Sequence, residues 1–322
     1  MSGHVWRGKK VLVTGGAGFI GSHLVDALVN EGARITVLDN LQAGRWTNID
    51  TSSENVRLVE GDVREAEGVN NIVRETQPEF VFHLAANASV PGSVDDPCYD
   101  FESNCGGTFV LLNAIRLAGI RSRTVVASSG AVYGEPEEFP IRENSSLAPI
   151  SPYGASKLAA EIEARMFSDV YEMQISMARI FNSYGPRMPR FVVFDFLKKL
   201  QSGPDHLEIL GNGKQVRDLN YVADTVTGLM VLATDGGSGE AYNVASGDSH
   251  DVTEIAHMLL DTLGLRDRTR ISYTGKSWSG DAQRWEVDIE KIQSLEYTPV
   301  VPLKEGLEQV ITWYQQTFGN IL

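Results

Sequence analysis

The sequence predicts an α/β fold: a doubly wound parallel sheet with helices on both faces, joined to a smaller α/β lobe towards the C-terminus. In the first half of the chain, short runs rich in Val and Ile alternate with segments whose apolar residues have helical spacing. Strands separated by helices form parallel sheets, and right-handed crossovers place the helices on both faces. Beyond Asn182 the alternation weakens, and Gly- and Pro-containing loop signals become frequent.

Six strands and four helices are expected in the sheet domain. The strand-like runs are 11–14, 35–38, 56–59, 80–84, 124–128 and 175–179, and the helical segments are 20–30, 65–76, 104–118 and 153–170. Further helices are expected near 222–233, 252–263 and 303–314. We therefore expect a sheet domain at 1–181 and a second lobe at 182–322, with the return of part of 214–248 to the first domain as an alternative.

Composition and charge narrow the classes of partner. The chain has 322 residues, 42% of them apolar and 22% charged, with a net charge of −14. This charge argues against nucleic acid or an anionic membrane surface as the main partner. The N-terminus lacks the apolar core of a signal peptide and no apolar run is long enough to span a bilayer, so a cytoplasmic protein is expected. Two cysteines, Cys98 and Cys105, and six scattered histidines predict neither a disulfide framework nor a metal site.

A glycine-rich turn follows the first strand and opens the first helix. Its sequence, Thr-Gly-Gly-Ala-Gly-Phe-Ile-Gly, fits the spacing of dinucleotide-binding turns. Gly15 allows the tight turn, Gly18 lets a pyrophosphate approach the backbone, and Gly21 lets helix and strand pack closely. The predicted helix begins at Ile20, so Phe19 and Ile20 lie where its N-terminus would meet the diphosphate. The alternative is a structural turn that binds nothing.

The second strand ends at an acidic residue, Asp39, at the spacing expected after such a turn. A carboxylate there accepts hydrogen bonds from both hydroxyls of an adenine ribose and repels a 2′-phosphate. The sequence therefore predicts NAD in preference to NADP.

A tyrosine and a lysine four residues apart, Tyr153 and Lys157, follow the fifth strand and share one face of a predicted helix. A phenol of pKa ~10 is a poor base at neutral pH, but a nearby Lys⁺ and the positive nicotinamide ring of NAD⁺ favour the phenolate. Lys157 could also hold the nicotinamide ribose. Ser129, at the end of the fifth strand, would bind the reacting hydroxyl and relay its proton to Tyr153. The structural alternatives are an exposed Tyr–Lys pair and a turn-capping serine.

Further motifs follow in order along nearly the whole chain. They are Leu38-Asp39-Asn40 with Gly44-Arg45, Gly61-Asp62-Val63, His83-Leu84-Ala85-Ala86, Asn104 with Gly107-Thr108, Ser128-Ser129 before Val132-Tyr133-Gly134, Ser151-Pro152-Tyr153, the run from Arg179 to Arg187, Gly211-Asn212-Gly213 with Gln215 to Asp218, and Gly280-Asp281. Together with the glycine turn they resemble extended short-chain dehydrogenases/reductases of the nucleotide-sugar epimerase and dehydratase group, most of all UDP-glucose 4-epimerases. The resemblance implies a Rossmann domain that binds NAD and a C-terminal lobe that binds a nucleotide-diphosphate sugar, with a UDP-sugar favoured.

The resemblance also assigns residues to each ligand. The cofactor set adds Asn40, Gly44, Asp62, Val63, Leu84, Ala85, Ala86 and Asn104, with Asp62 and Val63 at the adenine and Ala85 and Ala86 along the diphosphate. The substrate set is Ser89, Ser129, Asn182, Arg217 and Asp281, with Asn182 at the sugar-nucleotide diphosphate and Arg217 at its phosphate or ribose. A turn residue at Asp62, a loop cap at Asn182 and a surface ion pair at Arg217 are the structural alternatives.

The reaction implied by the resemblance begins when Tyr153 takes a proton from a sugar hydroxyl, usually at C4, and hydride passes to NAD⁺. Related 4,6-dehydratases carry an acidic pair directly after the residue matching Ser129, whereas this chain has Gly130 and Ala131. Without an acid and a base beside C5 and C6, the keto sugar would rotate and take the hydride back on its other face, which predicts a 4-epimerase. The alternatives are a dehydratase, decarboxylase or reductase on the same scaffold, or a non-catalytic dinucleotide-binding sensor.

Two further expectations concern the nucleotide base of the substrate and the oligomeric state of the protein. UDP-sugar epimerases usually have an arginine three residues before the aspartate of the Gly-Asp motif, where this chain has Trp278. The sequence therefore does not determine which nucleotide base the substrate carries. Lys276 or Arg284 could replace that charge. The segments 104–118 and 153–170 carry more apolar positions than one sheet-facing stripe needs, and relatives pair these helices, so a homodimer is expected.

Overall fold

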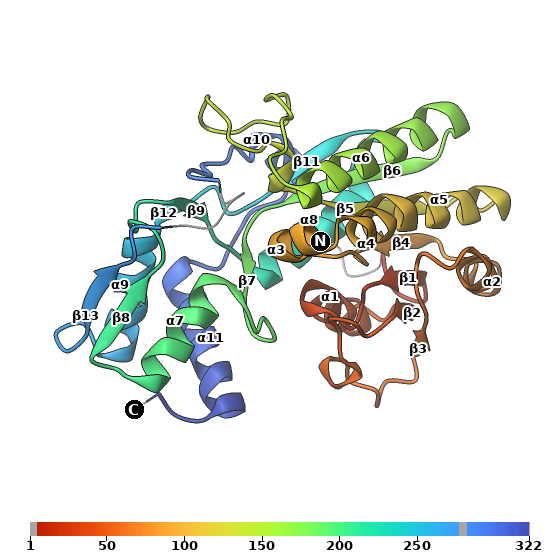
Figure 1. Cartoon of the computed structure of the whole chain (residues 1–322). Helices are drawn as coiled ribbons and strands as arrows, with labels where there is room; N and C mark the ends of the chain where they lie inside the picture. Colours follow the sequence, from red (N-terminus) through yellow and green to blue (C-terminus); the bar gives the residue numbers. More distant parts are fainter. Residues whose placement is uncertain (1–4, 277–281, 322) are drawn as a thin grey trace.

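The central feature of the fold is a sheet of seven parallel strands in the order β11-β6-β5-β4-β1-β2-β3 (Figure 1). The structure is a computed structural model that describes residues 5–276 and 282–321. The strands are β1 (Lys10–Thr14), β2 (Arg34–Asp39), β3 (Val56–Glu60), β4 (Phe80–His83), β5 (Arg123–Ser129), β6 (Gln174–Ile180) and β11 (Ala241–Val244). The predicted doubly wound α/β fold is confirmed, and the first six strands lie within two residues of their predicted bounds.

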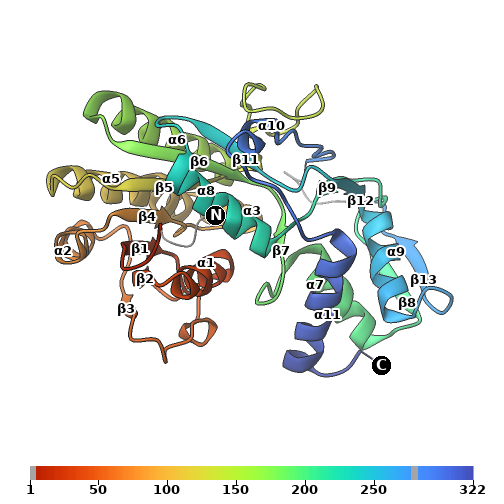
Figure 2. The same ribbon diagram turned by 180° about the vertical axis from the view of Figure 1, so that it is seen from behind.

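Helices cover both faces of the sheet, as Figures 1 and 2 show from opposite sides. One face carries α2 (Ala66–Thr76), α5 (Gly107–Leu117) and α6 (Pro152–Tyr171), and the other carries α1 (Phe19–Asn30) and α8 (Val222–Asp235). Short helices α3 (Val90–Asp95) and α4 (Pro97–Phe101) and a π-helical turn, η2 (Glu102–Gly106), precede α5. The sequence pattern had predicted a single helix over 104–118 because it could not detect the π-helical turn.

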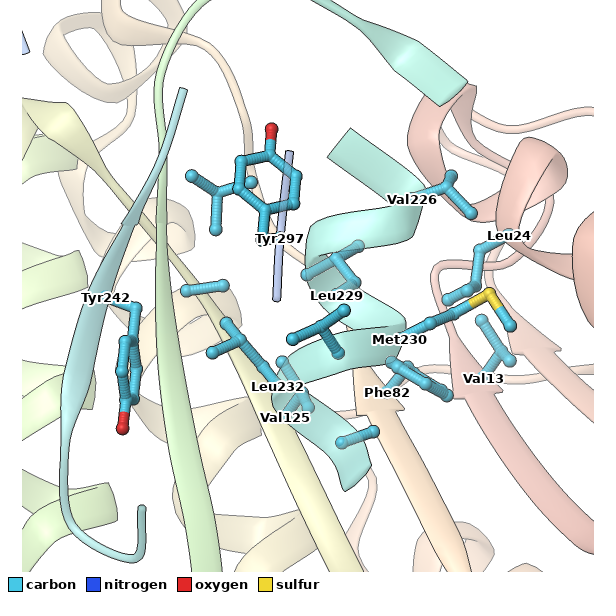
Figure 3. Close-up of a cluster of buried hydrophobic side chains, with 14 of the residues drawn as sticks. Val13, Leu24, Phe82, Val125, Val226, Leu229, Met230, Leu232, Tyr242 and Tyr297 are labelled. Atoms are coloured by element: carbon cyan, nitrogen blue, oxygen red, sulfur yellow. The ribbon is translucent and has the colours of Figure 1, made fainter. Parts of the chain in front are cut away.

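The core between α1, α8 and the sheet is built from alternate strand residues and the inner stripes of both helices (Figure 3). Leu24 of α1 and Leu229 of α8 are fully buried against Val13, Phe82 and Val125 of the sheet. Burial of such side chains is the main force that holds the layers together. The same cluster includes buried residues of 287–297, a segment that the sequence analysis placed in the second lobe.

The second lobe has its own core, made of helices around two short strand pairs. Its helices are α7 (Phe191–Ser202), α9 (Val252–Leu263) and α11 (Leu303–Phe318); β8 (His206–Ile209) pairs with β13 (Arg270–Tyr273), and β9 (Val216–Asp218) pairs with β12 (Ser249–Asp251). The remaining elements are η1 (Trp46–Asn48), η3 (Gly130–Val132), β7 (Ser183–Tyr184), β10 (Asn220–Tyr221) and α10 (Glu290–Gln293). Helix α7 was not predicted from the sequence, because the Pro and Gly residues that flank it on both sides are typical of loops.

Contacts between α1 and the loop before α7 join the two lobes. His23 Nε2 lies 2.9 Å from the carbonyl oxygen of Pro186, and Arg187 pairs with Asp26 at 2.7 Å. Within the described residues, no helix is long and apolar enough to cross a membrane. The two contacts of His23 and Arg187 hold the second lobe against α1, which follows the carboxyl end of β1.

The close packing of α1 on the glycine turn after β1 can be tested by a substitution at Gly21. A Cβ at Gly21 would lie 2.2 Å from the carbonyl oxygen of Gly15, which is backbone and has little freedom to move. Gly21→Ala should therefore lower the free energy of unfolding by about 3 kcal/mol, at the upper end of overpacking costs. Chemical denaturation of the two proteins measures the difference.

The matched control is Gly68→Ala in α2, where an added Cβ meets nothing within 4 Å. This change should leave stability unchanged or raise it by up to ~1 kcal/mol, because alanine favours a helix interior. Equal effects of the two substitutions would contradict the close packing at Gly21.

Candidate active site

The glycine turn is packed so closely that side chains are excluded from it. Gly15 has φ +71°, and a Cβ there would lie 2.6 Å from the backbone nitrogen of Ala85. Gly18 is the N-cap of α1, and no side chain caps the helix. The first turn of α1, at Phe19 and Ile20, can therefore offer its backbone N–H groups to an anion. These features fit the diphosphate of a dinucleotide.

Asp39 connects the end of β2 to this turn. Its carboxylate accepts hydrogen bonds from the backbone N–H groups of Ala17 and Leu41, both at 2.9 Å, and burial raises its pKa. Gly44 packs on the same turn, because a Cβ there would lie 2.8 Å from the carbonyl carbon of Ala17. Asp39 thus holds the turn in shape, and its two oxygens each retain a second lone pair for a ligand.

The residues expected at the adenine, Asp62 and Val63, follow β3. Asp62 accepts hydrogen bonds from Asn40 Nδ2 and Arg64 Nη2, both at 2.9 Å. Burial opposes ionisation of Asp62, but these bonds outweigh it and lower the pKa of Asp62 to about 2. Val63 is buried and would contact a side chain at Gly107. Asp62 is therefore ionised, and its carboxylate is paired with Arg64 and fixed by Asn40.

The chain after β4 lies against the glycine turn. The backbone N–H of Ala85, between Leu84 and Ala86, donates to Oγ1 of Thr14 at 3.3 Å. Thr14 Oγ1 also lies 2.7 Å from Nδ1 of His83, whose burial lowers its pKa to about 3. The imidazole is therefore neutral and serves as a buried hydrogen-bonding link.

Tyr153 and Ser129 meet at the carboxyl end of β5. Tyr153 lies in the first turn of α6, and its hydroxyl interacts with the side chain of Ser129. Ser129 Oγ also accepts a hydrogen bond from the backbone N–H of Ala131 at 3.2 Å, so it caps its turn as well. Burial raises the pKa of Tyr153, and the interaction with Ser129 and the charge of Arg190 only partly offset this. The sequence analysis expected Lys157 to lower this pKa; in the protein alone, burial dominates.

Lys157 is buried one turn further along α6, with 5% of its surface exposed. Its Nζ donates to the carbonyl oxygen of Ala127 at 2.8 Å. Burial lowers the pKa of Lys157 to about 8, against the opposing charges of Asp100 and Glu161. Lys157 is therefore a positioned ammonium whose charge can change within the working pH range.

The position after Ser129 has no space for a side chain. A Cβ at Gly130 would lie 2.6 Å from Cε1 of Phe181, whose ring stacks on Tyr133 and meets Trp285 edge-on. An acidic residue at Gly130 would therefore require Phe181 to move. The sequence shows that no acid stands at this position, and the structure adds a steric reason for its absence.

The residues expected at the substrate occupy separate elements. Ser89 caps α3, because its Oγ accepts a hydrogen bond from Gly92 N–H at 3.0 Å. Asn182 follows β6 and donates to the carbonyl oxygen of Asp218 at 3.4 Å. Arg217 lies in β9, with its guanidinium 5.6 Å from the Trp285 ring. Asp281 lies outside the described residues.

Three residues near the site were not predicted from the sequence. Arg190, the N-cap of α7, carries a charge that acts on Tyr153. Asp100 and Ser156 are buried in a polar cluster together with Asn104, whose amide bonds to both of them and to the backbone of Asn87. The amide of Asn104, expected at the cofactor, is thus engaged inside the protein. No local pattern marks these contacts, since most of them join residues far apart in sequence.

The chain matches the family described as GDP-mannose 4,6 dehydratase over residues 12–318. It is 34% identical over 308 residues to a putative UDP-glucose 4-epimerase of Methanocaldococcus jannaschii, which covers 94% of this chain and 97% of the relative. It is also 33% identical over 319 residues to UDP-glucuronic acid decarboxylase 1 of Xenopus tropicalis, with 96% of this chain and 72% of the relative covered.

The solved structures that resemble this chain are also nucleotide-sugar epimerases and dehydratases. UDP-glucose 4-epimerase of Thermotoga maritima, solved with UDP-glucose, has a TM-score of 0.89 at 34% identity and covers 95% of this chain and 99% of its own. The dTDP-glucose 4,6-dehydratase DesIV of Streptomyces venezuelae, solved with NAD, has a TM-score of 0.88 at 32% identity and covers 96% of this chain and 98% of its own. The chain therefore belongs to the nucleotide-sugar epimerase and dehydratase family of extended short-chain dehydrogenases/reductases.

Proposed function

We propose that the protein is an NAD-dependent 4-epimerase of a nucleotide-diphosphate sugar, with a UDP-sugar as the first candidate. The observation that carries this proposal is the pair Gly130 and Ala131, with the Phe181 ring packed over Gly130. A dehydratase needs an acid and a base beside C5 and C6 of the sugar. At Gly130 this chain offers neither a titratable group nor space for one.

The cofactor is NAD, as the family and its NAD-bound structures indicate. When bound, NAD supplies the acceptor and donor for hydride. The groups proposed to hold it are the first turn of α1 at the diphosphate, Asp39 at the adenine ribose, and Lys157 at the nicotinamide ribose. The conformation of the glycine turn fits this use because Gly15 and Gly21 exclude side chains from it.

Tyr153 is proposed to take the proton from the C4 hydroxyl, with Ser129 bound to the same hydroxyl as relay. The interaction between the side chains of Tyr153 and Ser129 supports this pairing of roles. Burial raises the pKa of Tyr153 in the protein alone, so phenolate formation requires added positive charge. Arg190 supplies part of this charge, and the nicotinium ring of NAD⁺ would add to it.

Epimerisation also requires a keto sugar that turns while its nucleotide stays bound. Asn182 and Arg217 are proposed to anchor the diphosphate and the ribose. They lie on separate segments of the second lobe, after β6 and in β9. An anchor at the nucleotide leaves the sugar ring free to present its other face, so hydride would return to C4 with inverted configuration.

Tyr153→Phe tests the proposed base. Removal of the hydroxyl should lower turnover by at least ~10²-fold, as is typical for loss of a positioned acid–base group, while NAD still binds. Tyr171→Phe, at the exposed end of the same helix, should keep the wild-type rate. A Tyr153→Phe variant with near wild-type turnover would remove Tyr153 from the mechanism.

A product assay tests the reaction itself. Incubation with UDP-, GDP-, CDP- and dTDP-sugars, without added reductant, should give an isomer of unchanged mass with a changed proton coupling at C4. Mass spectrometry and proton NMR would identify the product and the preferred base. Loss of water or of carbon dioxide would instead assign the chain to the dehydratases or decarboxylases among its relatives.

We also propose a homodimer that pairs α5 and α6 with the same helices of a second copy. These helices pack side by side and carry exposed apolar residues: Phe109 is 45% exposed, and Ile162 and Val170 are each 63% exposed. Large exposed apolar residues gathered on one face favour an interface between proteins.

Ile162→Glu should convert the dimer to a monomer, because a carboxylate would be buried without a partner in the interface. Sedimentation velocity measures the change. Val300→Glu, at a residue of the second lobe that is 73% exposed, should leave the dimer intact. A wild-type protein that sediments as a monomer, or an Ile162→Glu dimer, would contradict the proposed interface.

A further inference from the structure

Asp100 is a buried carboxylate that the proposed chemistry does not use. It lies in α4 with 1% of its surface exposed. α4 packs directly against α6, the helix that carries Tyr153 and Lys157. A buried carboxylate is costly unless hydrogen bonds and a compensating charge accompany it, so its presence beside the site requires a physical explanation.

Three segments donate hydrogen bonds to this carboxylate. Asn87 Nδ2, in the loop after β4, and Asn104 Nδ2, in η2, each donate to Oδ1 at 3.1 Å. Ser156 Oγ, in α6, donates to Oδ2 at 2.5 Å. Asp100 therefore ties the loop that follows Ala85 and Ala86 to the helix turn between Tyr153 and Lys157.

Each of these hydrogen-bond partners is a neutral side chain, so the charge of Asp100 has to be compensated elsewhere. The Lys157 ammonium is buried nearby, and its one described hydrogen bond goes to the neutral carbonyl of Ala127. Burial raises the pKa of Asp100 and lowers the pKa of Lys157, and the electrostatic interaction between the two groups opposes both shifts.

Among the other groups that face Lys157, only Glu161 also favours its charged form, and it does so less than Asp100. Glu161, one turn along α6, already bonds to Arg179 at 2.8 Å and to Ser128 at 2.5 Å. His83, in β4, is neutral at physiological pH because burial lowers its pKa to about 3. Tyr153, on the same helix, interacts with Asp100 but is neutral until it gives up its proton.

We propose that Asp100 is a positioning residue that keeps the buried Lys157 ammonium charged and fixes α6 against the loop after β4. This inference rests on the proposed role of Lys157 in holding NAD. It does not depend on whether the sugar is epimerised. Asp100 would thereby set the pH range in which the cofactor is held.

Asp100→Asn separates charge from hydrogen bonding. The amide oxygen can still accept from Asn87 and Asn104, and the new NH₂ group can donate to Ser156 Oγ. Ser156 can in turn donate to the carbonyl oxygen of Tyr153, which already lies 3.0 Å away. The variant therefore removes the charge while Asn87, Asn104 and Ser156 each keep a hydrogen-bond partner.

NAD affinity, measured by titration calorimetry from pH 6.5 to 9.5 without sugar, gives the readout. Wild-type affinity should begin to fall near pH 8, where Lys157 loses its proton. In Asp100→Asn the fall should move about one pH unit lower, because an opposite charge has been removed from beside the ammonium. A folded Asp100→Asn variant with an unchanged midpoint would overturn the proposal.

Asp224→Asn is the matched control. Asp224 is also buried, at 2% exposure, and its carboxylate accepts backbone hydrogen bonds from Val300 and Val301. Its variant should lose stability but keep the wild-type midpoint for NAD. A shift of the same size in Asp224→Asn would show that general destabilisation, and not the charge at Asp100, moves the profile.

A second pair of variants covers the case in which Asp100→Asn does not fold. If the uncompensated Lys157 charge is the cause, Asp100→Asn with Lys157→Met should fold, since both charges are gone. In a thermal-unfolding cycle the double variant should melt higher than the sum of the single effects predicts. A double variant that also fails to fold, or additive melting shifts, would overturn the coupling of the two charges.

Discussion

The site depends on one close backbone contact, between the glycine turn after β1 and the chain that follows β4. A Cβ at Gly15 would lie 2.6 Å from the nitrogen of Ala85, so these two segments can meet only without a side chain between them. The contact brings together the end of β1, the N-terminus of α1 and the loop after β4. Asp39 reinforces it from β2 through its bond to Ala17. The proposed cofactor positions are therefore set by backbone shape before any side chain contributes.

A buried polar network holds α6, the helix that carries Tyr153 and Lys157. Glu161 of α6 binds the guanidinium of Arg179 in β6, and Arg179 also donates to the Tyr133 hydroxyl at 2.8 Å. Tyr133 in turn donates to Asn243 of β11 at 2.7 Å. The network links α6 to the strand ends that lie beside Tyr153 and Ser129. Breaking one partner of such a buried pair leaves an uncompensated charge, so the helix is held in a defined position.

The sequence was sufficient to predict the parts of the fold that local pattern determines. The first six strands follow from Val- and Ile-rich runs, and the glycine turn follows from its spacing. Helix α7 was missed because Pro189 and Gly203-Pro204 next to its ends resemble a loop, although buried residues such as Phe196 hold the helix in place. The π-helical turn that places Asn104 inside the protein has no signature in the sequence.

The candidate site residues also fall into two groups, those that sequence motifs predict and those that only the folded chain brings near the site. Tyr153, Lys157 and Ser129 could be singled out from motifs, and in the structure the side chains of Tyr153 and Ser129 interact. The effect of burial on the pKa of Tyr153 could not be foreseen, because burial depends on neighbours from distant segments. Asp100, Arg190 and the ring of Phe181 over Gly130 were missed for the same reason. The proposed reaction follows from Gly130 and Ala131 in the sequence, and the folded chain adds the contact of Phe181 with Gly130 as a steric reason.

The most direct test of the account follows the hydride. With UDP-glucose, or the sugar that proves to be the substrate, deuterated at C4, an epimerase returns the label to the carbon from which it came. The account predicts a product of unchanged mass with inverted configuration at C4 and the deuterium still bound there, as read by NMR. A product that has lost water and carries the deuterium at C6 would contradict it.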